Sequence, residues 1–126
     1  MITKEMLSPC VICNENDSVL EVSKILRDTN SRHLFVCKNK KPIGIISTTD
    51  IVNRCIASDH EVKDCKASDI MTKEVKSIDV KNSLEEIEDL IEGSDPHSLP
   101  VTHEGKLIGI VELWQIVKLI MEKERK

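Results

Sequence analysis

Aromatic residues are scarce in this chain: its 126 residues include one Phe, one Trp and no Tyr. Proteins that stack nucleobases on aromatic side chains need more of them, so the scarcity argues against a nucleic-acid-binding platform. A net charge of -4 argues against a basic nucleic-acid binder as well. The chain also lacks any apolar run near the roughly 18–20 residues of a membrane-spanning helix, and its first residues carry no signal-peptide pattern. We therefore expect a cytoplasmic protein whose partners include neither nucleic acid nor a membrane.

Motifs of the common enzyme classes are absent too. The sequence has no phosphate-binding Walker loop, no G-x-S-x-G nucleophile elbow and no H-E-x-x-H zinc-protease signature. A carboxylate without an acid, base or nucleophile as partner does not make a catalyst. We therefore expect that the protein is not an enzyme, that it has no catalytic residues and that it requires no cofactor.

The five cysteines are an odd number, which fits a reducing compartment better than a disulfide framework. Cys10 and Cys13 form a C-x-x-C motif, which leaves a remote alternative open: a small cysteine-based metal or redox protein. No second C-x-x-C follows it. We therefore expect no metal site, and we expect both cysteines to act as small apolar residues.

The most informative feature that is present is an internal repeat. A shift of 65 residues aligns the sequence with itself without a gap. The aligned identities include Met6 with Met71, Ser18 with Ser83, Leu34 with Leu99, Val36 with Val101, and Ile43-Gly44-Ile45 with Ile108-Gly109-Ile110. The chain therefore divides into two repeats, residues 1–65 and 66–126.

Both repeats predict the same order of elements: strand, helix, strand, strand, helix. Ser18 with Glu21, and Ser83 with Glu86, fit the S-x-x-E capping box that begins a helix. In the first repeat we expect strands at 10–13, 34–37 and 43–46, a polar turn at 38–42 and a last helix at 48–57. In the second we expect strands at 75–78, 99–102 and 107–111 and a last helix at 113–123. The polar segment 58–68 is expected to link the repeats.

On these features the chain resembles a tandem pair of cystathionine-beta-synthase (CBS) domains, a Bateman module. The resemblance covers nearly the whole chain. Its most specific part is the run from Gly44 to Asp50, Gly-Ile-Ile-Ser-Thr-Thr-Asp, which matches the family's G-h-h-[ST]-x-x-D motif. The strand Leu99-Pro100-Val101, the capped first helices and the Met71-led start of the second repeat are its other parts.

The resemblance implies a fold of the α+β class with α/β-like repeats. Two β-α-β-β-α units pack sheet to sheet about a pseudo-twofold axis, with two clefts between them. It also implies a function, because such modules commonly bind adenosine-containing ligands (AMP, ADP, ATP or S-adenosylmethionine) in an inter-repeat cleft and regulate a partner. We therefore expect a stand-alone sensor module with an adenosyl regulatory ligand and an effector protein of unknown identity.

The residues of the motif suit such a ligand chemically. The carboxylate of Asp50 can accept hydrogen bonds from both vicinal hydroxyls of a ribose. Ser47 stands at a predicted helix start, where its hydroxyl and the free N–H groups suit a phosphate. The two residues also fit a capping box, and both roles can hold at once. Gly44 lets a ligand approach the backbone, Ile45 offers an aliphatic wall for adenine, and Thr49 belongs to the same motif.

In the family, the other wall of a cleft comes from the partner repeat. The matching positions here are Met71, Lys76, His97 and Ser98. Many family members have a basic residue directly before the Leu-Pro-Val strand to meet the phosphates. Ser98 occupies that position in this chain, and the departure weakens the case for a multiply charged phosphate.

A second possible cleft combines Arg32 and His33 with Glu112 and Gln115, which stand where the first repeat has its Ser and Asp. Glu112 would repel a phosphate, and Gln115 is a poorer acceptor for a diol. If a nucleotide binds, the cleft that contains Asp50 is therefore the better candidate.

The last helix of each repeat has an apolar face, and we expect these faces to build a homodimer. The residues concerned are Ile51, Val52 and Ile56 in the first repeat and Ile116, Val117 and Ile120 in the second. An alternative function follows from the same surface: a dimerisation or interaction module that binds no ligand.

Overall fold

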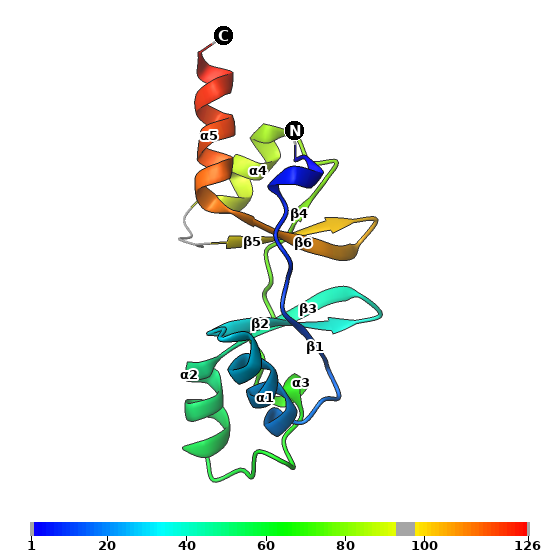
Figure 1. Cartoon of the computed structure of the whole chain (residues 1–126), viewed down its shortest axis with the longest axis vertical. Coiled ribbons are helices and arrows are strands. Elements are labelled where there is room, and N and C mark those ends of the chain that lie inside the picture. Colours follow the sequence, from blue (N-terminus) through cyan, green and yellow to red (C-terminus); the bar gives the residue numbers. More distant parts are fainter. Residues whose placement is uncertain (1, 93–97, 126) are drawn as a thin grey trace. The chain divides into compact units, whose positions relative to one another are not determined.

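The computed structural model describes residues 2–92 and 98–125, which fall into two compact units (Figure 1). The first unit is Val11–Val75, and the second unit combines Met1–Cys10 with Lys76–Lys126. Each unit contains a three-stranded sheet with its own helices. The mixed fold of strand, helix, strand, strand, helix, repeated twice, is confirmed.

The sheet of the first unit has its strands in the order β1 (Ile12–Asn14), β2 (His33–Lys38), β3 (Lys41–Ser47). The central strand β2 runs parallel to β1 and antiparallel to β3. The helices lie on one face of this sheet (Figure 1). They are α1 (Val19–Thr29), the short α2 (Thr48–Asp50), its π-helical continuation η2 (Ile51–Ile56), and α3 (Ala67–Ile70).

Local sequence explains where α1 begins and ends. The Ser18 hydroxyl accepts a hydrogen bond from the Glu21 N–H at 3.1 Å, which caps the first turn. Asn30 ends the helix in the left-handed conformation, with φ of 51°. Between these caps, three residues at helical spacing are buried against the sheet: Val19, Val22 and Leu26.

The second unit repeats this plan after a short 3₁₀ turn, η1 (Lys4–Met6). Its strands are β4 (Ile78–Asp79), β5 (Ser98–His103) and β6 (Lys106–Glu112), again parallel and then antiparallel. Its helices are α4 (Leu84–Ile91) and α5 (Leu113–Glu124). Six buried residues of this unit form a core cluster of their own: Ile78, Ile87, Leu99, Val101, Val111 and Ile116.

Three local expectations need correction. The turn predicted at 38–42 is shorter, because Asn39 and Lys40 make it alone with positive φ values of 51° and 68°, and Pro42 already belongs to β3. The segment 58–68, predicted as a linker, contains the start of α3. The first two N–H groups of this helix donate hydrogen bonds to the carbonyl oxygens of Asp17 and Glu15. The first strand of each repeat also begins two or three residues later than predicted.

The leading segments of the two repeats, residues 2–10 and 66–75, are exchanged between the units. Residue Ser8 pairs with Ile110 of β6 through two backbone hydrogen bonds of 2.9 and 3.0 Å. In the same way Thr72 pairs with Ile45 of β3 through two bonds of 2.9 Å. Each third strand therefore gains a neighbour from the repeat to which it does not belong, and the compact units do not follow the repeat boundary at residue 65.

Candidate functional site

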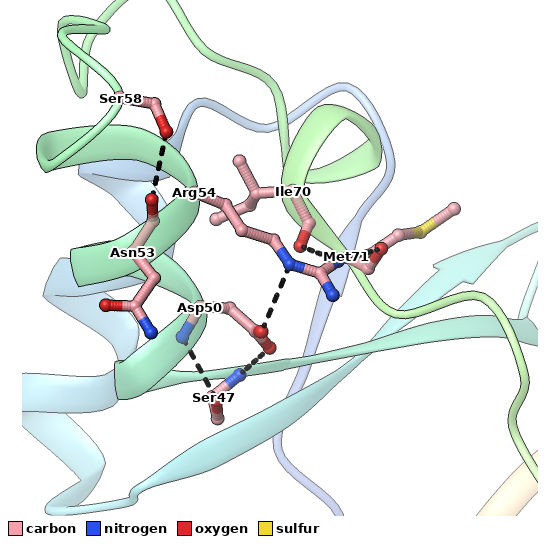
Figure 2. A network of polar contacts seen from close by, with 7 residues as sticks. All are labelled: Ser47, Asp50, Asn53, Arg54, Ser58, Ile70 and Met71. Atoms are coloured by element: carbon pink, nitrogen blue, oxygen red, sulfur yellow. Dashed lines mark hydrogen bonds and ion pairs between the residues drawn. The ribbon is translucent and has the colours of Figure 1, made fainter.

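The helix start that follows β3 carries the two polar residues of the motif, Ser47 and Asp50 (Figure 2). The Ser47 hydroxyl accepts from the Asp50 N–H at 3.2 Å, and Oδ2 of Asp50 accepts from the Ser47 N–H at 2.9 Å. This is a complete capping box, so the local role that the spacing allowed is present in the structure.

Capping leaves both side chains with hydrogen-bonding capacity. The Ser47 hydroxyl accepts one bond and can still donate its own proton, and a carboxylate can accept about four bonds. Oδ1 of Asp50 lies 3.6 Å from Nε of Arg54, which is an ion pair longer than a hydrogen bond. With its side chain 17% exposed, Asp50 can therefore still accept from a ligand hydroxyl at Oδ1.

Arg54 is a residue of this site that the motif did not reveal. Its Nη1 group donates to the carbonyl oxygens of Ile70 at 3.2 Å and Met71 at 3.3 Å, while Nε faces Asp50 (Figure 2). The spacing of four residues from Asp50 was the available signal, because residues four apart are neighbours on a helical face.

Gly44 is close to another part of the chain in this structure. A Cβ atom placed on Gly44 would stand 2.8 Å from Cγ of Met71, so only glycine lets that side chain lie where it does. The close approach that the sequence suggested for a ligand is therefore used by Met71, from the leading segment of the second repeat. Ile45, the next residue, is held by its pairing with Thr72.

The second unit repeats this arrangement at Gly109, which aligns with Gly44. A Cβ atom on Gly109 would stand 2.9 Å from the carbonyl oxygen of Ser8 and 3.3 Å from Cβ of Leu7. The glycine in each third strand thus makes room for the exchanged leading segment. This packing role explains, without reference to a ligand, why both repeats have a glycine between two isoleucines in the third strand.

The remaining predicted residues of the first unit lie around the same helix start. The carbonyl of Arg32 accepts from the Thr48 N–H at 2.9 Å, and His33 faces Ser47 in the β2–β3 register. The His33 ring meets Phe35 edge-on, with ring centroids 6.0 Å apart. Thr49 is exposed on α2.

Other predicted residues belong to the second unit, and His97 lies outside the described residues. Lys76 is exposed and precedes β4. Ser98 faces Glu112 in the β5–β6 register, and Oε1 of Gln115 accepts from the Glu112 N–H at 3.0 Å. The structure therefore brings Ser47, Asp50 and Met71 together in the first unit. The second unit contains Lys76, Ser98, Glu112 and Gln115.

Two of the hollows in the described parts of the chain are lined by neither Ser47 nor Asp50. One, of about 810 Å³, lies between the start of α4 and the end of α5 and includes Leu84 and Leu119. The other, of about 520 Å³, lies beside η2 in the first unit. Its lining is mostly charged: Arg54, Asp59, His60, Glu61, Asp64 and Asp69, with Cys65 and Ile70.

Cys13 behaves as the apolar residue that the repeat predicts, since Ile78 stands at the aligned position. Its side chain is in the core of the first unit and only 4% exposed. Burial, helped by the nearby Asp17 carboxylate, raises the pKa of the Cys13 thiol to about 12. Within residues 2–92 and 98–125, no three His, Cys, Asp or Glu side chains gather as metal ligands, and no helix there is both long and apolar enough to cross a bilayer.

Solved structures with similar folds include hypoxic response protein I, solved with two coordinated zinc ions. It is 21% identical, with a TM-score of 0.76 over 94% of this chain and 99% of that one. The CBS-pair protein CBSX2 from Arabidopsis thaliana is 20% identical, with a TM-score of 0.69 over 97% and 95%. The cytosolic domain of the Mg²⁺ channel MgtE, solved in complex with ATP, is 23% identical, with a TM-score of 0.71 over 90% of this chain and 46% of that one.

At these identities the structural likeness shows the fold alone, and no curated protein gives a significant match in sequence. The family is shown instead by the sequence model of the CBS domain. It matches the chain twice, over residues 2–57 and 67–122. Two successive matches that span most of the chain mean that this protein belongs to the CBS-domain family, as a tandem pair.

Proposed function

We propose that this chain is a regulatory module, not an enzyme, that binds an adenosine-containing ligand at Ser47 and Asp50 and acts on a partner protein. The observation that carries the proposal is the state of Asp50. Its carboxylate is fixed by the capping box through Oδ2, while Oδ1, among the residues that the structure describes, is contacted only at ion-pair distance. A preorganised carboxylate with a spare oxygen suits the vicinal hydroxyls of a ribose.

Two further observations support this proposal. The side chains of Ile45 and Met71 are each partly buried and can offer an adenine aliphatic walls, which fits a chain with few aromatic residues. The MgtE domain, which shares the fold, was solved in complex with ATP. The role of the other wall of this cleft in binding stays a prediction, for Lys76, His97 and Ser98. The possible second cleft also stays a prediction, with Arg32, His33, Glu112 and Gln115.

Ligand-dependent melting tests the proposal. The native chain would be melted alone and with AMP, ADP, ATP or S-adenosylmethionine, and a ligand at 100 times its dissociation constant should stabilise it by about 2.7 kcal/mol. Asp50→Asn should lose most of this gain, because the amide offers a diol a weaker acceptor.

Asp69→Asn provides the matched control. Asp69 also caps a helix start, since its Oδ2 accepts from the Lys66 N–H at 2.9 Å, but it is not part of the motif. The Asp69→Asn variant should therefore be stabilised by the ligand as much as the native chain. A native chain that no adenosyl compound stabilises would refute the proposed function, and equal gains in both variants would refute the site.

A second candidate function, a homodimer through the last helices, is favoured by exposed apolar side chains. On α5, Trp114 is 64% exposed and Val117 is 42% exposed. On η2, Val52 and Ile56 are more than half exposed. The predicted face needs correction, because Ile51 and Ile116 are buried in the cores of their own units.

The dimer and the ligand are tested separately. Light scattering during gel filtration should give twice the mass of 14.2 kDa for the native chain, and Val52→Glu with Val117→Glu should return the mass to that of a monomer. A native chain that stays monomeric at high concentration contradicts this second function. A dimer that forms without any adenosyl binding supports the ligand-free alternative.

A further inference from the structure

Arg54 has hydrogen-bonding capacity that its present contacts leave unused. Nε faces Asp50 and Nη1 donates to two carbonyl oxygens (Figure 2). Within residues 2–92 and 98–125, Nη2 makes no hydrogen bond, so two of the five donors of the guanidinium are available there. The side chain is 51% exposed and is held in place by its other contacts.

The helix start offers less to an anion than its sequence suggested. The Thr48 N–H is taken by the Arg32 carbonyl, and the Asp50 N–H by the Ser47 hydroxyl. Ser98, which stands where many family members have a basic residue, carries no charge. A phosphate near Asp50 is therefore left with the Ser47 hydroxyl proton and needs a further donor, and Arg54 is the cation in contact with Asp50.

Arg54 also changes the charge that a ligand meets. Alone, the Asp50 carboxylate would repel a phosphate, but paired with Arg54 the two side chains sum to zero. In the described parts of the chain, no other carboxylate oxygen lies within 4.0 Å of an Arg54 nitrogen. The acidic hollow lined by Asp59, Glu61, Asp64 and Asp69 is unsuited to a phosphate, so the anion is expected at the Asp50 end of the guanidinium.

We propose that Arg54 is the specificity-determining residue of the site and selects adenosyl ligands that carry phosphate over S-adenosylmethionine. The inference rests on the proposed function and narrows it to adenine nucleotides. A phosphate gains the two donors of Nη2 and a neutralised carboxylate. The sulfonium that S-adenosylmethionine carries in place of the 5′-phosphate gains nothing, because Arg54 repels it and cancels the attraction of Asp50. Its carboxylate is several bonds farther from the ribose than the phosphate of AMP.

Titration calorimetry with four probes tests this: adenosine, AMP, ATP and S-adenosylmethionine. The native chain should bind AMP and ATP more tightly than adenosine, and S-adenosylmethionine least tightly. Arg54→Gln should weaken the binding of AMP by about tenfold, which corresponds to one charge-assisted hydrogen bond, and the binding of ATP by at least as much. Adenosine should change by less than about twofold, because its hydroxyls still reach Asp50.

Two controls isolate the role of Arg54. Arg27→Gln makes the same change in net charge on the exposed face of α1, where Arg27 pairs with Asp28, and should leave all four affinities unchanged. Arg54→Lys keeps the charge and loses the guanidinium fork, so it should fall between native and Arg54→Gln. If Arg54→Gln does not fold, the salt dependence of the native chain replaces it: ATP binding should weaken with salt and adenosine binding should not.

Several outcomes would overturn the proposal. Equal losses for all four probes in Arg54→Gln would mean that Arg54 only holds Asp50 and the backbone in place. Tighter binding of S-adenosylmethionine than of AMP, or salt-independent ATP binding, would contradict it directly. If AMP and ATP binding weakens in Arg32→Gln but not in Arg54→Gln, the phosphate is bound by Arg32 and not by Arg54. If adenosine binds and charge makes no difference, only this inference fails, whereas if no probe binds, the proposed function fails with it.

Discussion

Nε of Arg54 lies 3.6 Å from Oδ1 of Asp50, one helical turn away, while Nη1 of the same side chain reaches the carbonyls of Ile70 and Met71. The guanidinium of Arg54 thus connects the Asp50 carboxylate, the proposed ligand-binding group, to the leading segment of the second repeat. The ion pair is partly exposed, and such pairs contribute about 0–1 kcal/mol. The two carbonyl bonds come from a charged donor and contribute more.

Loss of the Arg54 side chain should therefore matter mainly through the carbonyl bonds. We expect Arg54→Met to lower the free energy of unfolding by about 1–2 kcal/mol, measured by urea denaturation. A double-mutant cycle with Asp50→Asn should give a coupling below about 1 kcal/mol. A coupling as large as the whole effect would show that the ion pair, not the backbone contact, is the stabilising interaction.

The cap at Ser47 should be worth as much as an ordinary helix cap. We expect Ser47→Ala to cost about 1 kcal/mol of unfolding free energy, because the Asp50 N–H loses its partner. Ser18→Ala and Ser83→Ala remove the equivalent caps of α1 and α4 and should cost about the same. If Ser47→Ala alone proves neutral or stabilising, the hydroxyl is held for binding rather than for the helix.

Gly44 should not tolerate a methyl group while Met71 is present. We expect Gly44→Ala to destabilise the chain by about 1–3 kcal/mol, because the new Cβ would stand 2.8 Å from Met71 Cγ. In a Met71→Ala background the same change should cost much less, and thermal or urea unfolding of the four proteins measures the difference. An equal cost in both backgrounds would mean that Met71 does not occupy the space over Gly44.

Removal of residues 1–8 should harm the second unit, although chain ends usually tolerate deletion. Ile2, Met6 and Leu7 pack against the core cluster of that unit, and Ser8 pairs with Ile110. Burial of each such side chain contributes about 1.5–3 kcal/mol when complete, so we expect a loss of at least 3 kcal/mol. Hydrogen exchange should accelerate at Ile110 more than at Ile45, whereas equal protection at both would contradict the exchange of segments.

The buried thiol of Cys13 predicts a loss of stability in alkali. Its pKa is raised to about 12 in the folded chain, above the ordinary 9.0, so the unfolded chain gives up this proton first. Stability from this group is complete below pH 9 and declines as the pH rises from 9 toward 12. Urea unfolding between pH 8 and 10.5 should show a shallower decline in Cys13→Val, and identical pH profiles would refute the assignment.

The fold was largely predictable because its signals are local and occur twice. The capping boxes at Ser18 and Ser83, the Ile-Gly-Ile strands and the 65-residue shift together indicate every long element. The π-helical form of η2 and the helix α3 were not predictable, since neither has a distinctive periodicity and α3 is held by bonds to the loop around Asp17.

Less of the candidate site could be predicted. The motif located Ser47 and Asp50, because a helix cap and a diol acceptor need the same residue types at the same spacing. It did not reveal that Met71 covers Gly44, which requires knowing where a distant segment lies. Arg54 was missed for the same reason: its carbonyl partners at residues 70 and 71 are sixteen and seventeen positions away along the chain.

The exchange of leading segments gives the two units different folding problems. All of the first unit lies in one continuous stretch, Val11–Val75, so on the ribosome it can assemble as soon as that stretch has emerged. The second unit must bring residues 2–10, synthesised before the first unit, back to β6, synthesised after it, and so must close a loop that contains the whole first unit. Loop closure of this kind slows folding more than it weakens the product. The first unit can therefore form early, and the second completes its sheet only when the segment before the first unit meets β6.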